Sequence, residues 1–463
     1  MLPLLLDRTA TAPLPAQLAG QVRNLIVAGT LRRDDRLPSS RALAADLGVS
    51  RAVIEQAYEQ LLAEGWVSAR RGAGTFVAAP PGPGLGRSTD HRAHRGAQHG
   101  AGRAAGSTAP TATGRRHLDT GTPWVDVRHD PGWRRAWREV STAAPPPGYD
   151  DPRGLPALRV AIAERLARTR GLRVDPDEIV VTAGTTDGLR QLLPELPTGP
   201  VAIEDPGYRA AAETVRSHGR EVHDLPAAVP LPAVDGPLDG VVAVYVTPAH
   251  QHPLGRVMPA ADRLALLAAA ERTGALVIED DYDSEFRYDV APVPALVSLD
   301  RTRVAYLGTA AKSVLPTLRI GWLVAPPRLH EAIVARRLLT HTGAAWPCQR
   351  ALLTLLRDGW LDKQVRAARK VYAERAPRVA AALAPYADLA GPLAGMYSTW
   401  LLPEPDAVRA RDAARAAGFE VNLLSSYARS SPLTGLVVGF GGVSDAELDR
   451  ALAALTSALG ARA

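Results

Sequence analysis

Residues 78–117 constrain the fold of this 463-residue chain more than any other segment. They consist mainly of Ala, Gly, Pro, Arg and His, with one Leu and no aromatic residue. A segment of this composition buries too little apolar surface to offset the entropy that it would lose on ordering. We therefore expect a flexible, basic linker between two separately folded units, residues 1–77 and residues 118–463.

The basic charge of the chain lies toward its N-terminal end. The net charge is +6; residues 1–77 hold nine Arg against seven Asp and Glu, and residues 78–117 hold six Arg against one Asp. These two segments therefore carry +2 and +5, which leaves −1 for the remainder. An excess of Arg at one end predicts an anionic partner for that end.

Three further features bound the class of protein. The only cysteine is Cys348, so we expect no intramolecular disulfide framework and a cytoplasmic protein. No run of about 18 uninterrupted apolar residues is present, so a membrane span is not expected. The histidines of residues 78–117 are irregularly spaced and lack cysteine partners, so we expect no metal site.

The pattern of residues 1–77 predicts three helices followed by a β-hairpin. PAQLAGQVRNLIVAGTL has apolar residues at helical spacing, SSRALAADLG opens on serine caps and ends on Gly48, and the third helix follows a Ser50 cap. WVSARRGAGTFVA then supplies two β-prone runs around a glycine-rich turn. This order, with a short turn before the third helix, is typical of a winged helix-turn-helix.

The third helix of such a domain enters the DNA major groove by its N-terminal residues. Ser50 and Arg51 stand there, and Arg41 begins the second helix, where it can contact a phosphate. The hairpin supplies further residues for the DNA backbone or minor groove, namely Arg70, Arg71, Gly74 and Thr75. Each Arg alone also fits a solvated surface charge, whereas the set at a helix start and a hairpin tip predicts DNA contact.

Residues 118–463 alternate short apolar runs with helical or loop-like stretches. The runs are EIVVTAG, PVAIEDPGY, VVAVYVTP, ALVIEDDYDSEF, RVAYLGTAAK and IGWLVAP. Near-continuous apolar strands of this kind predict an α/β unit with a mostly parallel sheet that helices cover on both faces. Ligands of such sheets bind beyond the carboxyl ends of the strands, where most of the candidate polar residues stand.

Lysine is rare in this chain and one lysine is unusually placed. Of 54 basic residues only Lys312, Lys363 and Lys370 are lysines, and the last two lie in a charged, helical-looking stretch. Lys312 instead follows the apolar run VAYLG and stands among small residues. Because a partly buried lysine can lose its proton and condense with an aldehyde, whereas arginine stays protonated, the pattern predicts a Schiff-base lysine.

The residues around Lys312 and after the neighbouring strands complete a site for pyridoxal phosphate. Thr309 and Arg319 flank the lysine and can hold a phosphate. A second anion site is expected at a helix N-terminus formed by Gly184, Thr185 and Thr186.

The acidic run EDDYDSEF supplies the residues for the cofactor ring. Asp280 can pair with a protonated pyridine nitrogen, and Tyr282 can donate to a ring hydroxyl. Taken singly, each of these residues also fits an ordinary structural role, such as a solvated lysine, a helix cap or a packing tyrosine.

With these residues in place, residues 118–463 resemble a fold-type I, class I aminotransferase. The whole chain resembles the MocR subfamily of GntR transcription regulators, a winged helix-turn-helix fused to such a domain. The matching segments are LPSSRALAADLGVSRAVIEQAYEQLLAEGWVSARRGAGTFVA, GYDDPRGLPALRVAIAERLARTRG, EDPGY, TPAHQHPLG, EDDYDSEFRY and GTAAKSVLPTLRIGW. The resemblance implies a smaller C-terminal α/β subdomain beside the main sheet.

The resemblance also assigns roles to individual residues. It implies that Lys312 forms the internal aldimine, that Asp280 and Tyr282 contact the pyridine nitrogen and the ring oxygen, and that the phosphate is held by Thr309, Arg319, Gly184, Thr185 and Thr186. Tyr208 is expected to stack on the ring, and His252 stands where aminotransferases carry an Asn bonded to the ring oxygen. Tyr149 matches a tyrosine that reaches the phosphate of the neighbouring subunit, which implies a homodimer with shared sites. Arg41, Ser50 and Arg51 match DNA-contacting positions.

The chain departs from the aminotransferase pattern at several positions. Ala310 and Ala311 precede the lysine where aromatic and hydroxyl residues are usual in aminotransferases. The DNA-binding domain departs from its own family as well, since Ala52 stands in the recognition helix where Thr is common. Val437 occupies the place of the Arg that binds a substrate carboxylate; Arg429 lies upstream and is a candidate substitute. Loss of that clamp would weaken the binding and orientation of an amino-acid substrate.

These features together predict a cytoplasmic transcription regulator that binds pyridoxal phosphate and an operator in double-stranded DNA. We expect it to sense pyridoxal phosphate itself, or an amine that forms an aldimine with it. Two alternatives stay open: an active aminotransferase with an appended DNA-binding domain, and a DNA-binding protein whose second domain is only a dimerisation scaffold. A residual transaminase half-reaction is compatible with the sequence.

Overall fold

The computed structural model describes residues 2–8, 13–70, 74–78, 115–125, 130–234, 236–288 and 294–460. Its N-terminal unit contains α1 (Leu14–Val27), α2 (Ser40–Leu47), α3 (Arg51–Ala63), β1 (Val67–Arg70) and β2 (Gly74–Val77). β1 and β2 pair in antiparallel fashion, with Arg70 opposite Gly74. The expected order of three helices and a hairpin is confirmed.

Local sequence signals set the bounds of these helices. The Ser39 hydroxyl caps α2 by accepting a hydrogen bond of 3.2 Å from the Ala42 amide. Gly48 ends α2 in the left-handed conformation, at φ 62°, which permits the sharp turn into α3. Ser50 is the N-cap residue of α3, although its side chain makes no capping hydrogen bond. The apolar faces of α1 and α3 meet in a small core that includes Leu18, Val22, Ile54, Ala57 and Leu61.

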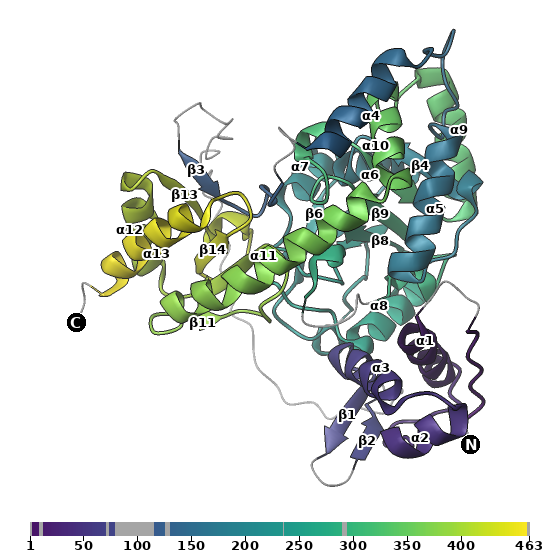
Figure 1. The fold of residues 1–463 in the computed structure, drawn as a ribbon, viewed down its shortest axis with the longest axis horizontal. Coiled ribbons are helices and arrows are strands. Elements are labelled where there is room, and N and C mark those ends of the chain that lie inside the picture. Colours follow the sequence, from purple (N-terminus) through teal and green to yellow (C-terminus); the bar gives the residue numbers. More distant parts are fainter. Residues whose placement is uncertain are drawn as a thin grey trace.

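The C-terminal unit is built from two sheets and the helices around them (Figure 1). The elements of the larger part are α4 (Pro131–Thr142), α5 (Pro156–Arg170), β4 (Ile179–Thr182), α6 (Thr185–Leu192), β5 (Val201–Asp205), α7 (Arg209–Ser217), β6 (Val222–Pro226), β7 (Ala243–Val246), α8 (Ala260–Thr273), β8 (Leu276–Asp281), β9 (Val304–Thr309), β10 (Gly321–Val324), α9 (Pro327–Thr340) and α10 (Trp346–Arg357). The smaller part contains β3 (Arg116–Leu118), β11 (Asp388–Leu389), β12 (Tyr397–Leu401), α12 (Glu404–Ala416), β13 (Phe419–Leu423), β14 (Gly435–Gly439) and α13 (Asp445–Gly460). The long helix α11 (Trp360–Leu383) runs between the two parts.

The larger sheet has seven strands in the order β4-β10-β9-β8-β7-β5-β6. Its strands are parallel from β9 to β6, while β10 is antiparallel to both of its neighbours. The expected mostly parallel sheet is therefore confirmed. All six apolar runs found in the sequence form strands; β6 was missed because its sequence, VHDLP, is polar and lies at the sheet edge.

Helices cover both faces of this sheet, as the apolar strands require. Alternate residues of one strand point to opposite faces: Val181 packs with α5, α8 and α10, and Val180 packs with α6, α7 and α9. In β9, Val304 and Tyr306 belong to the first core, and Ala305 and Leu307 to the second. The sheet is thus fixed on both sides, and its strand ends are free to carry a site.

The smaller sheet has five strands in the order β11-β12-β14-β13-β3. Strand β3 pairs in parallel with β13, so Arg116 and His117 of the expected linker are part of this sheet. Strand β3 thus begins two residues before the expected end of the linker; strand pairing uses backbone groups, which side-chain composition does not reveal. Most of the other residues from 78 to 117 lie outside the described ranges. Among the helices that the structure describes, none is long and apolar enough to cross a membrane.

Candidate functional site

The carboxyl ends of β5, β7, β8 and β9 lie at one edge of the larger sheet because these strands are parallel. Lys312 lies three residues beyond β9, and its Nζ donates hydrogen bonds of 3.0 Å to the carbonyl oxygens of both Thr120 and Gly121. Burial lowers the pKa of the Lys312 amine, while the carboxylates of Asp119 and other acidic residues oppose this shift. The lysine is therefore partly prepared to act as a neutral nucleophile.

Asp280 lies in β8, beside β9, and is 3% exposed. Its Oδ2 accepts a hydrogen bond from the Tyr245 hydroxyl, and its Oδ1 has no hydrogen-bond partner among the described residues. Burial raises the pKa of Asp280 to about 7, although hydrogen bonds from Tyr245 and Thr185 act in the opposite direction. A carboxylate in this setting is well suited to a cationic N–H donor.

Tyr282 belongs to a buried network of hydrogen-bonded rings. Its hydroxyl lies 2.7 Å from the Tyr397 hydroxyl and donates to the His250 carbonyl oxygen at 3.0 Å. His250 Nδ1 in turn lies 2.6 Å from Asp283 Oδ2, and both side chains are almost fully buried. The sequence did not point to Tyr397 or Asp283, because they are distant from His250 along the chain.

His252 lies at the centre of a group of aromatic rings. Its ring makes edge-on contacts with Tyr208, Tyr282, Tyr397 and Tyr427 at centroid distances of 5.2 to 5.8 Å. Burial lowers the pKa of His252 to about 3, and the charge of Lys312 adds to this effect. His252 is therefore neutral at physiological pH and can donate one hydrogen bond and accept another.

A glycine-rich turn leads into α6, where Gly184 is the N-cap residue at φ 100°. A Cβ atom on Gly321 of β10 would lie 2.8 Å from the Gly184 Cα, so the two backbones pack directly against each other. Thr186 follows in the first turn, and its Oγ1 lies 3.4 Å from the Tyr208 hydroxyl. Tyr208, Thr185 and Thr186 thus lie around Asp280, as expected for one site.

Thr309 and Arg319 lie on either side of the Lys312 segment. The Thr309 hydroxyl accepts from the Ala311 amide at 3.1 Å and donates to the Ile320 carbonyl at 3.1 Å, so it shapes the turn before the lysine. Arg319 adopts the left-handed conformation at φ 54° and has an exposed side chain whose charge acts on Tyr208. A left-handed residue other than glycine costs about 1 kcal/mol or more, which indicates a constrained position.

Two residues considered from the sequence lie elsewhere. Tyr149 is 82% exposed and stacks on His341 at 3.7 Å, and among the described residues no contact joins it to Lys312. Arg429 is bound inside the protein: its guanidinium contacts Asp224 at 2.6 Å and the carbonyl oxygens of Ile203 and Glu204 at 2.9 Å. Its donors are used between β5 and β6, so Arg429 does not supply a free carboxylate clamp.

Arg209 is a candidate cation that sequence reasoning missed. It begins α7 directly after Tyr208, its side chain is exposed, and its guanidinium carbon lies 4.9 Å from the centroid of the Tyr427 ring. Its charge also acts on His252. Its position directly after Tyr208, which follows β5, is the sequence signal by which Arg209 could have been found.

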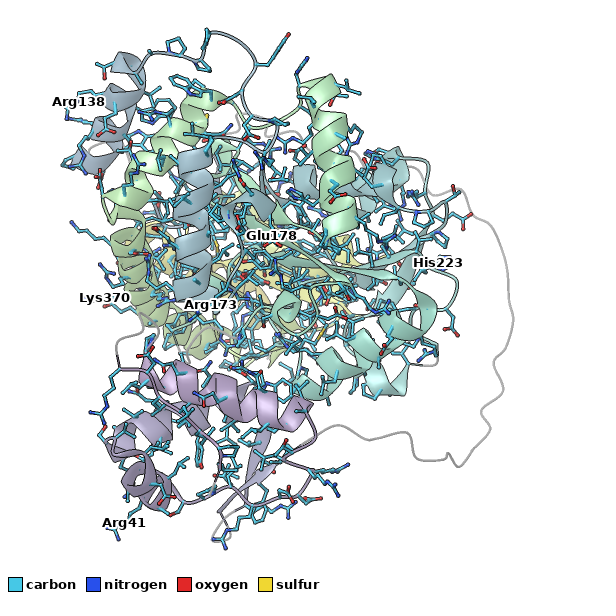
Figure 2. All side chains as sticks on the ribbon, turned by 90° about the vertical axis from the view of Figure 1, so that its right-hand side faces the viewer. Arg41, Arg138, Arg173, Glu178, His223 and Lys370 are labelled. Atoms are coloured by element: carbon cyan, nitrogen blue, oxygen red, sulfur yellow. The ribbon has the colours of Figure 1, made fainter. Side chains whose placement is uncertain are left out.

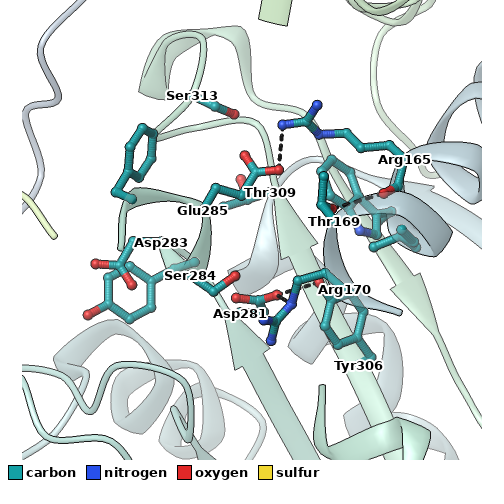
Figure 3. A pocket seen from close by; sticks show the side chains of 14 residues that line it. Arg165, Thr169, Arg170, Asp281, Asp283, Ser284, Glu285, Tyr306, Thr309 and Ser313 are labelled. Carbon is teal, nitrogen blue, oxygen red and sulfur yellow. Dashed lines mark hydrogen bonds and ion pairs between the residues drawn. The ribbon is translucent and has the colours of Figure 1, made fainter. Parts of the chain in front are cut away.

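A second cluster lies behind the strand ends, around a cavity of about 20 Å³ (Figure 3). Arg170 of α5 contacts the Asp281 carboxylate at 2.6 Å, and the Tyr306 hydroxyl donates to the same carboxylate at 2.6 Å. Although burial opposes it, the Asp281 charge raises the pKa of Arg170. Arg165 bridges Glu285 and Asp362 in the same region. This cluster holds the end of β8 against α5 and so fixes Asp280 in place.

One of the expected DNA-binding residues, Arg41, lies on the side of the N-terminal unit away from the C-terminal unit (Figure 2). Arg41 is exposed at the outer end of this unit (Figure 2). Arg51 folds back along α3 and contacts Glu55 at 2.6 Å, an exposed pair that a phosphate can replace. Ser50 occupies the N-cap position of α3 beside it.

The hairpin holds the remaining candidates. Arg70 pairs with Asp34 and lies over the Phe76 ring at 4.5 Å, so it is positioned by the strands. Gly74 adopts φ 110° at the start of β2, and Thr75 pairs with Ala69. Arg71 lies outside the described residues. In the described part of the chain, no group of three or more His, Cys, Asp or Glu residues is arranged to hold a metal ion.

Comparisons with known proteins agree with this architecture. The family model for bacterial regulatory proteins of the gntR family matches residues 14–77, and that for aminotransferases of class I and II matches residues 118–455. The HTH-type pyridoxine biosynthesis transcriptional regulator PdxR of Corynebacterium glutamicum is 34% identical over 467 residues, which cover 99% of this chain and 98% of that protein.

Two further comparisons extend this result. The probable rhizopine catabolism regulatory protein MocR of Rhizobium meliloti is 34% identical over 482 residues, 98% of this chain and 95% of that protein. The crystal structure of an archaeal alanine:glyoxylate aminotransferase superposes with a TM-score of 0.66 at 24% identity, over 75% of this chain and 91% of that one, which shows the fold alone.

A winged helix-turn-helix joined to an aminotransferase fold defines a DNA-binding transcription regulator rather than a free-standing enzyme domain. The chain belongs to the MocR subfamily of the GntR regulators, as its sequence motifs suggested.

Proposed function

We propose that this regulator is a cytoplasmic homodimer that binds pyridoxal phosphate at Lys312 and responds to that cofactor, or to an amine that exchanges with it. The observation that carries the proposal is that Lys312 and Asp280 lie at the same edge of one sheet. Lys312 is a partly buried lysine of lowered pKa, and Asp280 is a buried carboxylate with one oxygen that has no hydrogen-bond partner among the described residues. The charge of Asp280 acts on Lys312, which supports a single site.

The residues present fit pyridoxal phosphate, which when bound supplies an aldehyde that condenses with primary amines. The unpartnered Oδ1 of Asp280 can accept from a protonated pyridine nitrogen. The first turn of α6 and the exposed Arg319 provide donors for a phosphate. Space is available at the turn, because a Cβ atom added to Gly184 would meet nothing within 4 Å.

The protein residues have separate tasks in this proposal. Tyr208, next to Thr186, would cover one face of the ring, and Tyr282 and His252 would contact its polar edge. The carbonyl oxygens of Thr120 and Gly121 hold the Lys312 amine through hydrogen bonds when no aldehyde competes for it. The aromatic rings around His252 limit the access of water to the lysine.

Exposed apolar side chains support the homodimer. Leu338 and Leu339 are 59% and 80% exposed near the end of α9, three and two residues before His341. Tyr149 stacks on His341, so its ring adds to the same surface. A surface patch of this kind is typical of a protein–protein interface. It would place Tyr149 next to a second subunit, as its role in a shared site requires.

An active aminotransferase is the alternative, and the structure gives it less support. Val437, which occupies the place of the usual carboxylate-binding Arg, is uncharged and fully buried in β14. Arg429 is bound between strands, so it does not offer a free cation to a substrate carboxylate either. Steady turnover with an amino acid and a keto acid, followed by absorbance, would favour this alternative. The absence of turnover together with cofactor binding would favour the regulator.

The proposal is tested on the full-length protein with pyridoxal phosphate as the probe. Borohydride reduction followed by peptide mapping should place the label on Lys312, and Lys312→Ala should lose both the label and the absorbance band. Lys363→Ala, on α11, is the matched control. On the DNA upstream of its own gene, the wild type and Lys363→Ala should respond to the cofactor, whereas Lys312→Ala should not. A Lys312→Ala protein that responds as the wild type does would overturn the sensing role.

A further inference from the structure

The winged helix-turn-helix packs on the first turn of α8 (Figure 1). The Ala260 amide donates a hydrogen bond of 3.0 Å to the Glu64 carbonyl oxygen. Ala260 is 3% exposed and belongs to the core of the N-terminal unit, and Leu264 and Leu299 pack against the same core. Gly65 lies against Pro259, because a Cβ atom added to it would meet the Pro259 Cβ at 3.5 Å.

This contact joins the recognition helix end to end with α8. Glu64 is the C-cap residue of α3, and Ala260 is the first residue of α8. The last carbonyls of a helix and the first amides of a helix lack partners within their own helices. Here the Glu64 carbonyl at the end of α3 and the Ala260 amide at the start of α8 are hydrogen-bond partners. A cleft of about 1730 Å³ lies beside the joint, lined by residues of α1, α5 and α11, so the two units are not in contact there.

Glu64 adds a buried charge to the joint. Its carboxylate is 2% exposed, lies 3.1 Å from Arg23 and accepts from Gln60 at 2.9 Å. Separating the buried Glu64 carboxylate from Arg23 would cost free energy, whereas movement of the whole N-terminal unit keeps the pair together. The N-terminal unit is therefore expected to dock and undock as one body.

Arg263, one turn further along α8, connects this joint to the cofactor pocket. Its guanidinium is buried and donates to the carbonyl oxygens of Met258 at 2.9 Å, Pro248 at 3.0 Å and Pro294 at 3.0 Å. Pro248 and Met258 lie at the two ends of the loop of residues 247–258, which are also joined by a backbone hydrogen bond of 2.9 Å. His252 lies inside this loop, so Arg263 holds closed the loop that forms one side of the pocket.

A second route runs through β8. Glu279 precedes Asp280 and accepts hydrogen bonds of 2.8 and 2.9 Å from the amides of Leu296 and Val297. Leu299, which packs on the N-terminal unit, lies two residues further on. Burial lowers the pKa of Arg263 to about 10, while the charges of Glu279 and Glu64 oppose this shift. Arg263 is thus electrostatically linked both to the strand of Asp280 and to the docked domain.

We propose that the loop of residues 247–258, Arg263 and the first turn of α8 couple the cofactor pocket to the docking of the winged helix-turn-helix, with Arg263 as the positioning residue. This rests on the proposed function of the pocket as a pyridoxal phosphate site. A ligand that favours one arrangement of the loop then favours one docking state of α3. Because coupling is reciprocal, loss of docking changes the affinity of the pocket by the same factor.

The test uses the full-length protein and pyridoxal phosphate. Ala260→Arg places a charged, bulky side chain in the joint, and Ala268→Arg places the same side chain on the exposed part of α8. Hydrogen exchange of residues 51–64 reports docking, and absorbance titration reports cofactor affinity. We expect Ala260→Arg to expose α3 and to change the dissociation constant at least threefold, and Ala268→Arg to change neither. If α3 is exposed and the affinity stays within twofold of the wild type, the coupling does not exist.

Two further variants separate coupling from general damage. Leu264→Gln is a milder break of the same joint, and it replaces Ala260→Arg if that protein fails to fold in thermal unfolding. Arg263→Lys should weaken cofactor binding on its own and abolish the additional effect of the joint variant, whereas additive effects would contradict its positioning role. If the wild type itself takes up no cofactor on Lys312, it is the proposed function that fails; if it does so with no response to undocking, only this inference fails.

Discussion

The Tyr245 hydroxyl donates to one oxygen of the Asp280 carboxylate, and the other oxygen has no hydrogen-bond partner among the residues that the structure describes. The carboxylate is buried, and this burial raises its pKa from 3.8 to about 7. In the absence of cofactor the folded protein therefore binds a proton at Asp280 in a pH range where the unfolded chain does not. Stability contributed by this residue falls as the pH rises from about 4 to about 7.

Asp280→Asn removes this dependence and tests it. The free energy of unfolding of the variant minus that of the wild type should rise from pH 4.5 to pH 8, by at most about 4 kcal/mol. Urea unfolding of both proteins without cofactor at the two pH values measures the difference. Tyr245→Phe should move the transition to higher pH, since the Tyr245 hydrogen bond lowers the pKa of Asp280. An Asp280→Asn difference that does not change with pH would contradict the assigned shift.

Arg209 is expected to favour amines that also carry an acid group. Its exposed guanidinium lies over Tyr427 at 4.9 Å, and its charge acts on His252 at the pocket. Arg209→Ala should weaken the response of the cofactor-loaded protein to an acidic amine by about three- to tenfold, with little change for a neutral amine, because a charge-assisted hydrogen bond is lost. Absorbance titrations with the two amines measure this, and Arg216→Ala on the same helix is the control. Equal losses for both amines would count against the assignment.

Arg41 should contribute to DNA affinity mainly through a phosphate. Arg41→Ala is expected to weaken binding to all sequences by a similar factor and to reduce the slope of the logarithm of affinity against the logarithm of salt concentration by about one. Binding measured by fluorescence anisotropy at several salt concentrations provides both values. Arg138→Ala is the control, because Arg138 lies on α4 at the opposite end of the molecule (Figure 2). A loss confined to one sequence would instead indicate contact with a base.

Gly321 should be needed to hold the turn before α6. A Cβ atom there would lie 2.7 Å from the Gly308 carbonyl oxygen and 2.8 Å from the Gly184 Cα. Gly321→Ala must displace the turn, so we expect a loss of about 1–3 kcal/mol in stability and weaker cofactor binding. Gly20→Ala in α1, where nothing lies within 4 Å, is the control and should be neutral or slightly stabilising. Unchanged cofactor affinity in Gly321→Ala would show that the turn does not hold the phosphate.

The sequence predicted those parts of the fold and site that depend on local patterns. The apolar strands, the caps at Ser39 and Gly48, and the positions of Asp280 at the end of a strand and of Lys312 just beyond one all follow from residues close together in the chain. The network of His250, Asp283 and Tyr397 could not be found in this way, because the fold brings its members together from distant segments. The same holds for Arg263, which looks like an ordinary surface residue of a helix until its carbonyl partners are seen.

Arg429 shows the opposite error. From the sequence it is a free cation near the right place, but in the fold its donors meet the Asp224 carboxylate and two backbone carbonyls. The choice of partner for a long, flexible side chain depends on all neighbouring acceptors, which only the tertiary structure reveals. Strand β3 was missed for a related reason, since its pairing with β13 uses backbone groups alone.

The end-to-end contact of α3 with α8 has a consequence for how these regulators diversify. It combines a main-chain carbonyl, a main-chain amide and the small or rigid residues Gly65, Pro259 and Ala260 with the apolar side chains of Leu264 and Leu299. None of these residues is among the expected DNA-contacting residues or the residues assigned to the cofactor, so substitutions at those two sites can leave the joint intact. Changes of operator or of ligand in this chain are therefore separable from the connection between its two units.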